Sequence, residues 1–115
     1  MEQHDTLESF EEFNQRLNEK KELDLCKTAV AQIGGSDFGD HIKKAMQRCL
    51  TNSLMTKMNF TGKVKKLSFG NTNFFKMLKD VVMNMYGVTE SQVVAKVVNY
   101  LKWAPERVGG GGRKK

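Results

Sequence analysis

Apolar residues recur at three- and four-residue steps along most of the chain, which is the period of amphipathic helices. The first such stretch covers about residues 6–18. Its apolar face consists of Leu7, Phe10, Phe13 and Leu17. Asp5 precedes Glu8 by the spacing of a capping box, so we expect Asp5 to cap this helix. The pattern predicts a short acidic helix that packs on the rest of the chain or docks on a partner.

Two further helices are predicted on either side of Gly34–Gly35. The second helix covers Leu23–Ile33 and ends at the glycine pair, because glycine adopts the left-handed cap conformation at low cost. The third helix begins after a cap at Ser36 or Asp37, and its apolar pattern continues past a bend at residues 51–53. Its apolar positions before the bend are Phe38, Ile42, Ala45, Met46, Cys49 and Leu50.

The segment from Asn59 to Asn71 interrupts the helical period. It has an aromatic residue and a glycine at each end, Phe60 with Gly62 and Phe69 with Gly70. Three lysines lie between these ends, at Lys63, Lys65 and Lys66. The residues expected to point inward in a short extended piece are Val64, Leu67 and Phe69. The pattern predicts a basic loop that is held at both ends by buried aromatic residues and presents cations to a polyanion.

The last two helices have clear boundaries. A fourth helix, capped by Asn71 or Thr72, ends near Tyr86 and is apolar around more than half of its circumference, so we expect it to be the central helix. A fifth helix begins at Thr89, where a glutamine three residues later completes a capping box. We expect Pro105 to stop this helix.

These elements predict an all-α protein, a compact orthogonal bundle of about five helices with a basic loop between helices three and four. At 115 residues the chain is long enough for one hydrophobic core. Residues 1–107 are expected to form a single helical domain. Residues 108–115, which contain four glycines followed by Arg-Lys-Lys, are expected to form a flexible basic tail.

The net charge of +6 is distributed unevenly. Residues 1–40 contain four Lys or Arg and ten Asp or Glu, a net charge of −6, whereas residues 41–115 contain fifteen and three, a net charge of +12. Such an asymmetry indicates a polyanionic partner for the second part. The alternative is that the two parts attract each other and their fields largely cancel.

Residues that could carry catalysis or bind a metal are sparse. Cys26 and Cys49 lie on apolar helix faces and are interpreted as buried residues of a protein in a reducing compartment, while His41 is interpreted as a surface residue. No nucleophile–base pair or metal-ligand motif occurs, so we predict no enzyme activity, cofactor, metal or small-molecule substrate. Neither a signal peptide nor a membrane span is predicted.

Several motifs together resemble a known family. They are TLESFEEFNQRL, AQIGGSD, RCLTNSLMTKMNFTGK and VVNYLKWAPER. Across about residues 6–107 the chain resembles the metazoan domain of unknown function 4806, which implies an all-helical module of transposon-related or nuclear-regulatory proteins but no established activity. A looser resemblance, in a Thr-Gly loop between helices and a basic C-terminal helix region, is to the BEN domain, a small helical DNA-binding module.

Charge and resemblance together predict a nuclear DNA-binding module of a transposon-related or transcription-regulatory protein, although a basic surface does not distinguish DNA from RNA. The candidate nucleic-acid-binding residues are Lys63, Lys65, Lys66, Lys76, Lys79, Lys102, Arg107, Arg113, Lys114 and Lys115. The alternative is a protein-interaction or homodimerisation module with a methionine-lined groove. The methionines that could line it are Met46, Met55, Met58, Met77, Met83 and Met85.

Overall fold

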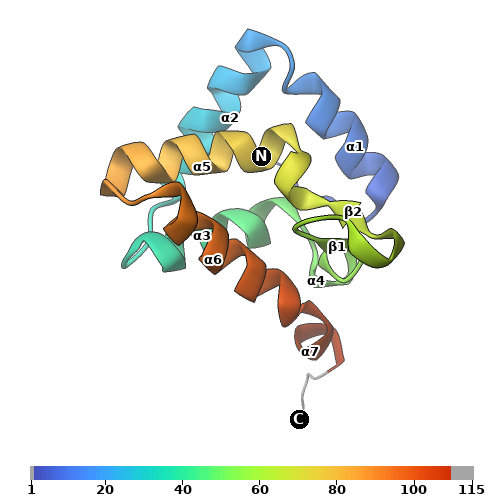
Figure 1. The fold of residues 1–115 in the computed structure, drawn as a ribbon. Helices are drawn as coiled ribbons and strands as arrows, with labels where there is room; N and C mark the ends of the chain where they lie inside the picture. Colours follow the sequence, from blue (N-terminus) through green and yellow to red (C-terminus); the bar gives the residue numbers. More distant parts are fainter. Residues whose placement is uncertain (1, 110–115) are drawn as a thin grey trace.

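The computed structural model describes residues 2–109, and this part of the chain is mostly helical, as predicted (Figure 1). Five helices have ten residues or more: α1 (Leu7–Arg16), α2 (Lys20–Ile33), α3 (Phe38–Cys49), α5 (Asn73–Tyr86) and α6 (Glu90–Lys102). Two are short: α4 (Asn52–Met55) and α7 (Ala104–Gly109).

The predicted cap of α1 is wrong by one residue. Thr6 caps the helix, because its hydroxyl accepts a hydrogen bond from the Ser9 amide at 3.1 Å. The Asp5 carboxylate instead accepts a hydrogen bond from the Thr51 hydroxyl at 2.7 Å. Asp5, which the local spacing predicts as the cap, therefore makes a long-range contact with Thr51 instead.

The glycine pair ends α2 as predicted. Gly34 caps the helix with a φ of +66°, in the left-handed region that glycine tolerates. Gly35 is required for a different reason, since a Cβ atom there would lie 2.6 Å from the backbone nitrogen of His41. Asp37, one of the two predicted caps of α3, accepts a hydrogen bond from the Asp40 amide at 2.8 Å.

The bend predicted near residues 51–53 is a complete break between α3 and α4. Leu50 is extended, and Thr51 caps the next helix by accepting a hydrogen bond from the Leu54 amide. The N-terminal segment pairs with the chain at this break. The His4 amide donates to the Cys49 carbonyl at 2.7 Å, and the Thr51 amide donates to the His4 carbonyl at 3.0 Å. The break therefore provides the backbone groups that hold the first residues of the chain.

Two short strands lie between α4 and α5. Strand β1 (Met58–Asn59) pairs in parallel with β2 (Leu67–Ser68), with Met58 opposite Leu67. The intervening chain includes the 3-10 helix η1 (Lys63–Lys65), and a second 3-10 turn, η2 (Phe69–Asn71), leads into α5. The extended piece expected here is therefore two very short strands.

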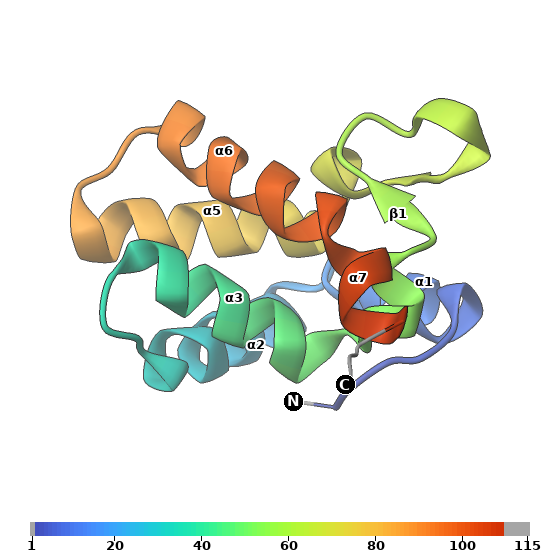
Figure 2. The same cartoon turned by 90° about the horizontal axis from the view of Figure 1, so that it is seen from below.

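Helix α5 is the central helix, as predicted. Thr72 caps it by accepting a hydrogen bond from the Phe75 amide at 3.0 Å. The helix packs against α1, α2, α3 and α6, and Figure 2 shows it between α6 on one side and α2 with α3 on the other. Its buried residues are Phe74, Phe75, Met77, Leu78, Val81 and Val82.

His41 is buried, so its prediction as a surface residue is wrong. Its Nε2 atom lies 2.8 Å from the Val30 carbonyl oxygen of α2, and its Nδ1 atom lies 2.8 Å from the Tyr86 hydroxyl of α5. Because the carbonyl only accepts, Nε2 carries a proton and donates it to Val30, while Nδ1 forms a hydrogen bond with the hydroxyl. The imidazole joins three helices at their packed faces.

The end of the described chain differs from the prediction. The predicted capping box at Thr89 is present and starts α6, which ends at Lys102. Pro105 does not end the helical part of the chain, because α7 begins just before it at Ala104 and continues to Gly109. Proline is tolerated in the first turn of a helix, where its missing N–H has no helical partner. The helix thus extends beyond the expected start of the tail at residue 108.

Candidate nucleic-acid interface

The turn at residues 62–66, called the lysine turn below, is fixed by its neighbours. The Asn59 side chain donates a hydrogen bond to the Lys63 carbonyl at 2.8 Å and accepts one from the Gly62 amide at 2.5 Å. The Lys66 amide donates to the Lys63 carbonyl at 3.2 Å. Because β1 and β2 pair on either side of it, the turn has a defined backbone.

The lysine turn has an unfavourable backbone conformation at its tip. Val64 and Lys65 have φ values of +55° and +60°, in the left-handed region where side chains other than those of glycine, asparagine and aspartate are uncommon. The Val64 side chain is 84% exposed, so the expectation that it points inward is wrong. Its three lysine neighbours, Lys63, Lys65 and Lys66, are exposed as well. The turn therefore presents an apolar side chain among cations.

Aromatic residues support the chain on both sides of the lysine turn. Phe69 is fully buried, and Phe60 packs edge-on against Phe75 with the ring centroids 5.1 Å apart. The Gly70 amide and the Ser68 hydroxyl both donate to the Phe60 carbonyl, each at 3.0 Å. A Cβ atom on Gly70 would lie 2.7 Å from the Phe60 ring, which explains the glycine.

The C-terminal end of α6 lies beside this segment. Figure 2 shows β1 next to the end of α6, and the two elements are in contact. A surface hollow between them has both Lys66 and Lys102 in its lining. The other lining residues are Met58, Asn59, Phe60, Val98, Leu101 and Pro105. Two predicted site residues that are distant in the sequence therefore meet at one apolar hollow.

An exposed tryptophan extends this surface. Trp103 follows Lys102 at the end of α6 and is 47% exposed. The Lys102 ammonium lies 5.3 Å from the centroid of the Trp103 ring, within the range of a cation–π contact. Trp103 and the exposed Val98 are absent from the predicted site. The signal that could have indicated Trp103 is its position directly after a lysine at a helix end.

Most of the other predicted site residues are less available to bind a nucleic acid. Lys79 pairs with Glu90 at 3.5 Å, whereas Lys76 is exposed on α5. Arg107, a predicted nucleic-acid-binding residue, is already engaged within the protein, because its guanidinium donates to the Asn52 side chain at 2.8 Å and to the Tyr100 carbonyl at 2.7 Å. The three cations of the tail, Arg113, Lys114 and Lys115, lie outside the described residues.

The acidic first helix does not neutralise the lysine turn within residues 2–109. The ion pairs in this part of the chain are Lys20–Asp24, Lys44–Asp40 and Lys79–Glu90, and none of them includes a residue of α1. The cations of the lysine turn and Lys102 form no ion pair among these residues. Their charges therefore face solvent.

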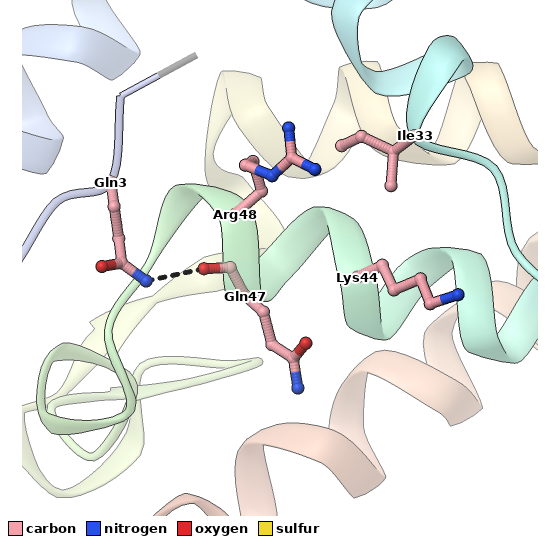
Figure 3. A pocket seen from close by; sticks show the side chains of 5 residues that line it. All are labelled: Gln3, Ile33, Lys44, Gln47 and Arg48. Carbon is pink, nitrogen blue, oxygen red and sulfur yellow. Dashed lines mark hydrogen bonds between the residues drawn. The ribbon is translucent and has the colours of Figure 1, made fainter.

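A second basic hollow lies on the outer side of α3 (Figure 3). Its lining residues are Gln3, Ile33, Lys44, Gln47 and Arg48. The Gln3 side chain donates to the Gln47 carbonyl at 2.8 Å, and Lys44 pairs with Asp40 at 3.0 Å. In Figure 3 the Arg48 side chain lies toward Ile33, whereas the Gln47 side chain points away from it. These polar groups do not converge on one point, so the hollow is a weaker candidate for an anion site.

The buried thiols have little reactivity at neutral pH. Burial raises the pKa of Cys26 to about 11, and burial also raises the pKa of Cys49, with the nearby Cys26 thiol adding to the rise. A protonated thiol is a poor nucleophile and metal ligand. Among the described residues no group of three or more histidine, cysteine or acidic side chains could hold a metal ion. Within residues 2–109, every helix is too short or too polar to cross a membrane.

Comparison with known proteins finds no protein-family model, curated protein or solved structure that matches this chain. The resemblance to the domain of unknown function 4806 and to the BEN domain stays a prediction from the sequence motifs.

Proposed function

We propose that this chain is a DNA-binding module that contacts phosphates through the lysine turn and the end of α6. The observation that carries the proposal is the convergence of Lys66 and Lys102 at one hollow, with two further exposed lysines on the adjoining turn. Lysine ammonium groups bind backbone phosphates and release counterions, which gives affinity without base recognition. The nuclear, transposon-related or transcription-regulatory setting implied by the motifs is part of the proposal.

The shape of the turn also supports phosphate binding. The hydrogen bonds from Asn59 and the strand pairing fix the backbone that carries Lys63, Lys65 and Lys66. Binding to a fixed backbone requires less ordering of the chain, so more of the interaction free energy remains as affinity. The exposed lysine side chains themselves stay adaptable and can follow a phosphate backbone of either duplex or single-stranded DNA.

Salt dependence tests the proposal. If four lysines each neutralise one phosphate, the logarithm of the binding constant should fall with the logarithm of salt concentration with a slope of about −3.6 on duplex DNA. Changing Lys63, Lys65 and Lys66 together to alanine should weaken binding and reduce the slope by about one unit for each lysine. Fluorescence anisotropy of a labelled random-sequence duplex at several salt concentrations measures both quantities.

A matched variant separates a local site from net charge. Changing Lys20, Lys21 and Lys27 to alanine removes the same charge from α2, which Figure 1 shows away from β1 and β2. This control should bind with a slope close to that of the unmodified protein. Equal losses in the two triple variants, or no binding of the unmodified protein to either duplex or single-stranded DNA at low salt, would reject the proposal.

A protein partner is the second candidate for the same surface. Val64, Val98 and Trp103 are exposed apolar side chains there, and apolar residues surrounded by cations also occur where proteins associate. Light scattering over a range of protein and salt concentrations distinguishes the two. Self-association that strengthens at high salt, together with the absence of DNA binding, would favour this candidate over DNA.

A further inference from the structure

We propose that Trp103 is a stacking platform for an unpaired base, which makes single-stranded DNA the preferred ligand of the surface described above. This inference rests on the proposed DNA-binding function and specifies its substrate class. Trp103 is the single tryptophan of the chain, and almost half of its surface is exposed. Exposure of a large apolar ring is unfavourable in water, so the free protein holds a surface that gains from being covered.

The backbone around Trp103 is held by contacts on both sides. Ala104 is fully buried, and the Trp103 carbonyl accepts a hydrogen bond from the Arg107 amide at 3.3 Å. The Arg107 guanidinium lies 3.6 Å from the centroid of the Tyr100 ring and donates to the Tyr100 carbonyl. These contacts fix the junction of α6 and α7, so the indole is presented by a rigid part of the molecule. Because the backbone that carries the indole is already fixed, little of the chain has to be ordered when a base stacks on the ring.

Cations continue from the ring to the lysine turn. The Lys102 ammonium lies over one face of the Trp103 ring, which leaves the other face for a base, and Lys102 shares the hollow with Lys66, which belongs to the turn. A strand that places a base on Trp103 can therefore place its next phosphates near Lys102, Lys66 and the remaining lysines. An aromatic platform joined to a cationic track is the arrangement by which proteins bind single strands with little sequence preference.

A duplex cannot use this platform in the same way. Its bases are stacked on one another and paired, and a protein ring reaches their faces only if a base is flipped out at a cost in free energy. The lysines can contact the phosphates of a duplex, but the indole would gain little. The indole therefore distinguishes unpaired from paired DNA, whereas the lysines bind both.

Intrinsic fluorescence tests the inference directly, because Trp103 is the only tryptophan. Titration with a 20-residue oligothymidine should quench the emission to a plateau, and a 20-base-pair duplex should quench it much less. Anisotropy should show tighter binding of the single strand. Trp103→Ala should weaken single-strand binding by about 5- to 150-fold, the range expected for the loss of one stacked base, while changing duplex binding by less than about twofold.

Two further variants serve as controls for the effect of Trp103→Ala. Trp103→Phe keeps a ring and should retain most of the single-strand affinity, whereas Val108→Ala removes an exposed apolar side chain from the adjoining helix α7 and should leave the affinity unchanged. Circular dichroism establishes that each variant is folded. Binding of both DNA forms without quenching, or equal losses for both forms in Trp103→Ala, would overturn the stacking platform and leave the proposed DNA-binding function in place. Absence of binding to either form at low salt would overturn both.

Discussion

At the scale of single residues, Val64 places a β-branched side chain at a φ of +55° with nothing covering it. The left-handed region costs roughly 1–2 kcal/mol for most L-residues, and asparagine adopts it more readily. We therefore expect Val64→Asn to raise the free energy of unfolding by about 1 kcal/mol in urea denaturation. Val98→Asn, at an exposed position in α6, is the control and should change it by less than about 0.5 kcal/mol. A loss of stability in Val64→Asn would show that the valine makes a contact that offsets its backbone strain.

For His41, the position in the helix predicts burial correctly, whereas the residue type suggests a surface residue. It lies three residues after Phe38 and four before Ala45, so the helical period places it on the apolar face of α3. A histidine is seldom placed in a core on residue type alone, because its buried polar atoms need partners. Those partners, the Val30 carbonyl and the Tyr86 hydroxyl, come from other helices and cannot be identified from the sequence around His41.

At the scale of elements, Arg107 connects α7 to α4 and α6. Its guanidinium donates to Asn52 and to the Tyr100 carbonyl, and it covers the Tyr100 ring. Arg107→Ala should lower the free energy of unfolding by about 2 kcal/mol, because two charge-assisted hydrogen bonds and a packed surface are lost. Thermal unfolding measures the change, and hydrogen exchange should locate the lost protection in α7.

The same variant tests whether Arg107 belongs to the DNA site. Since its guanidinium is occupied within the protein, we expect Arg107→Ala to leave the salt slope of DNA binding unchanged. Glu106→Ala, at the exposed neighbouring position, should alter neither stability nor binding by a measurable amount. A slope reduced by one unit in Arg107→Ala would show that this arginine contacts a phosphate after all.

Local chemistry predicted the helices better than the chain between them. The capping box at Thr89 and the glycine at Gly34 act within one turn of helix, so the sequence identifies them without knowledge of the fold. The pairing of β1 with β2 depends on residues brought together across the lysine turn, and nothing in two-residue strands marks it. The sequence does not predict α7, because a proline that ends many helices also fits the first turn of a new one, as Pro105 does here.

At the scale of the whole molecule, tertiary packing decides which cations can act together. The three lysines of the turn are adjacent in the sequence, so their clustering could be predicted. The meeting of Lys66 with Lys102 could not, because it depends on the contact between β1 and the end of α6. The hydrogen bond between Arg107 and Asn52 and the exposure of Trp103 both depend on how α7 packs against α4. The local sequence does not determine this packing.

The first residues of the chain are also held by distant ones, and His4 is the buried centre of this contact. Its ring stacks on Phe13 with the centroids 4.9 Å apart, and its Nδ1 atom lies 2.6 Å from the Ser9 hydroxyl. Its Nε2 atom is buried without a hydrogen-bond partner among the described residues. Burial lowers the pKa of His4, and Arg16 lowers it further, although Glu2 opposes the shift.

This lowered pKa makes the stability of the N-terminal contact around His4 sensitive to acid. Because His4 binds a proton more weakly in the folded state than in the unfolded state, the unfolded state gains protons first as the pH falls below about 6.5. The contribution of His4 to stability is therefore complete above that pH and decreases as the pH falls toward the folded-state pKa.

Urea denaturation between pH 7.5 and 5.5 should show this loss of stability in the unmodified protein. In His4→Phe, which keeps a ring against Phe13 but cannot titrate, the loss should be smaller. Parallel pH profiles for the two proteins would show that His4 does not take up a proton on unfolding, and that the N-terminal contact is not linked to its charge.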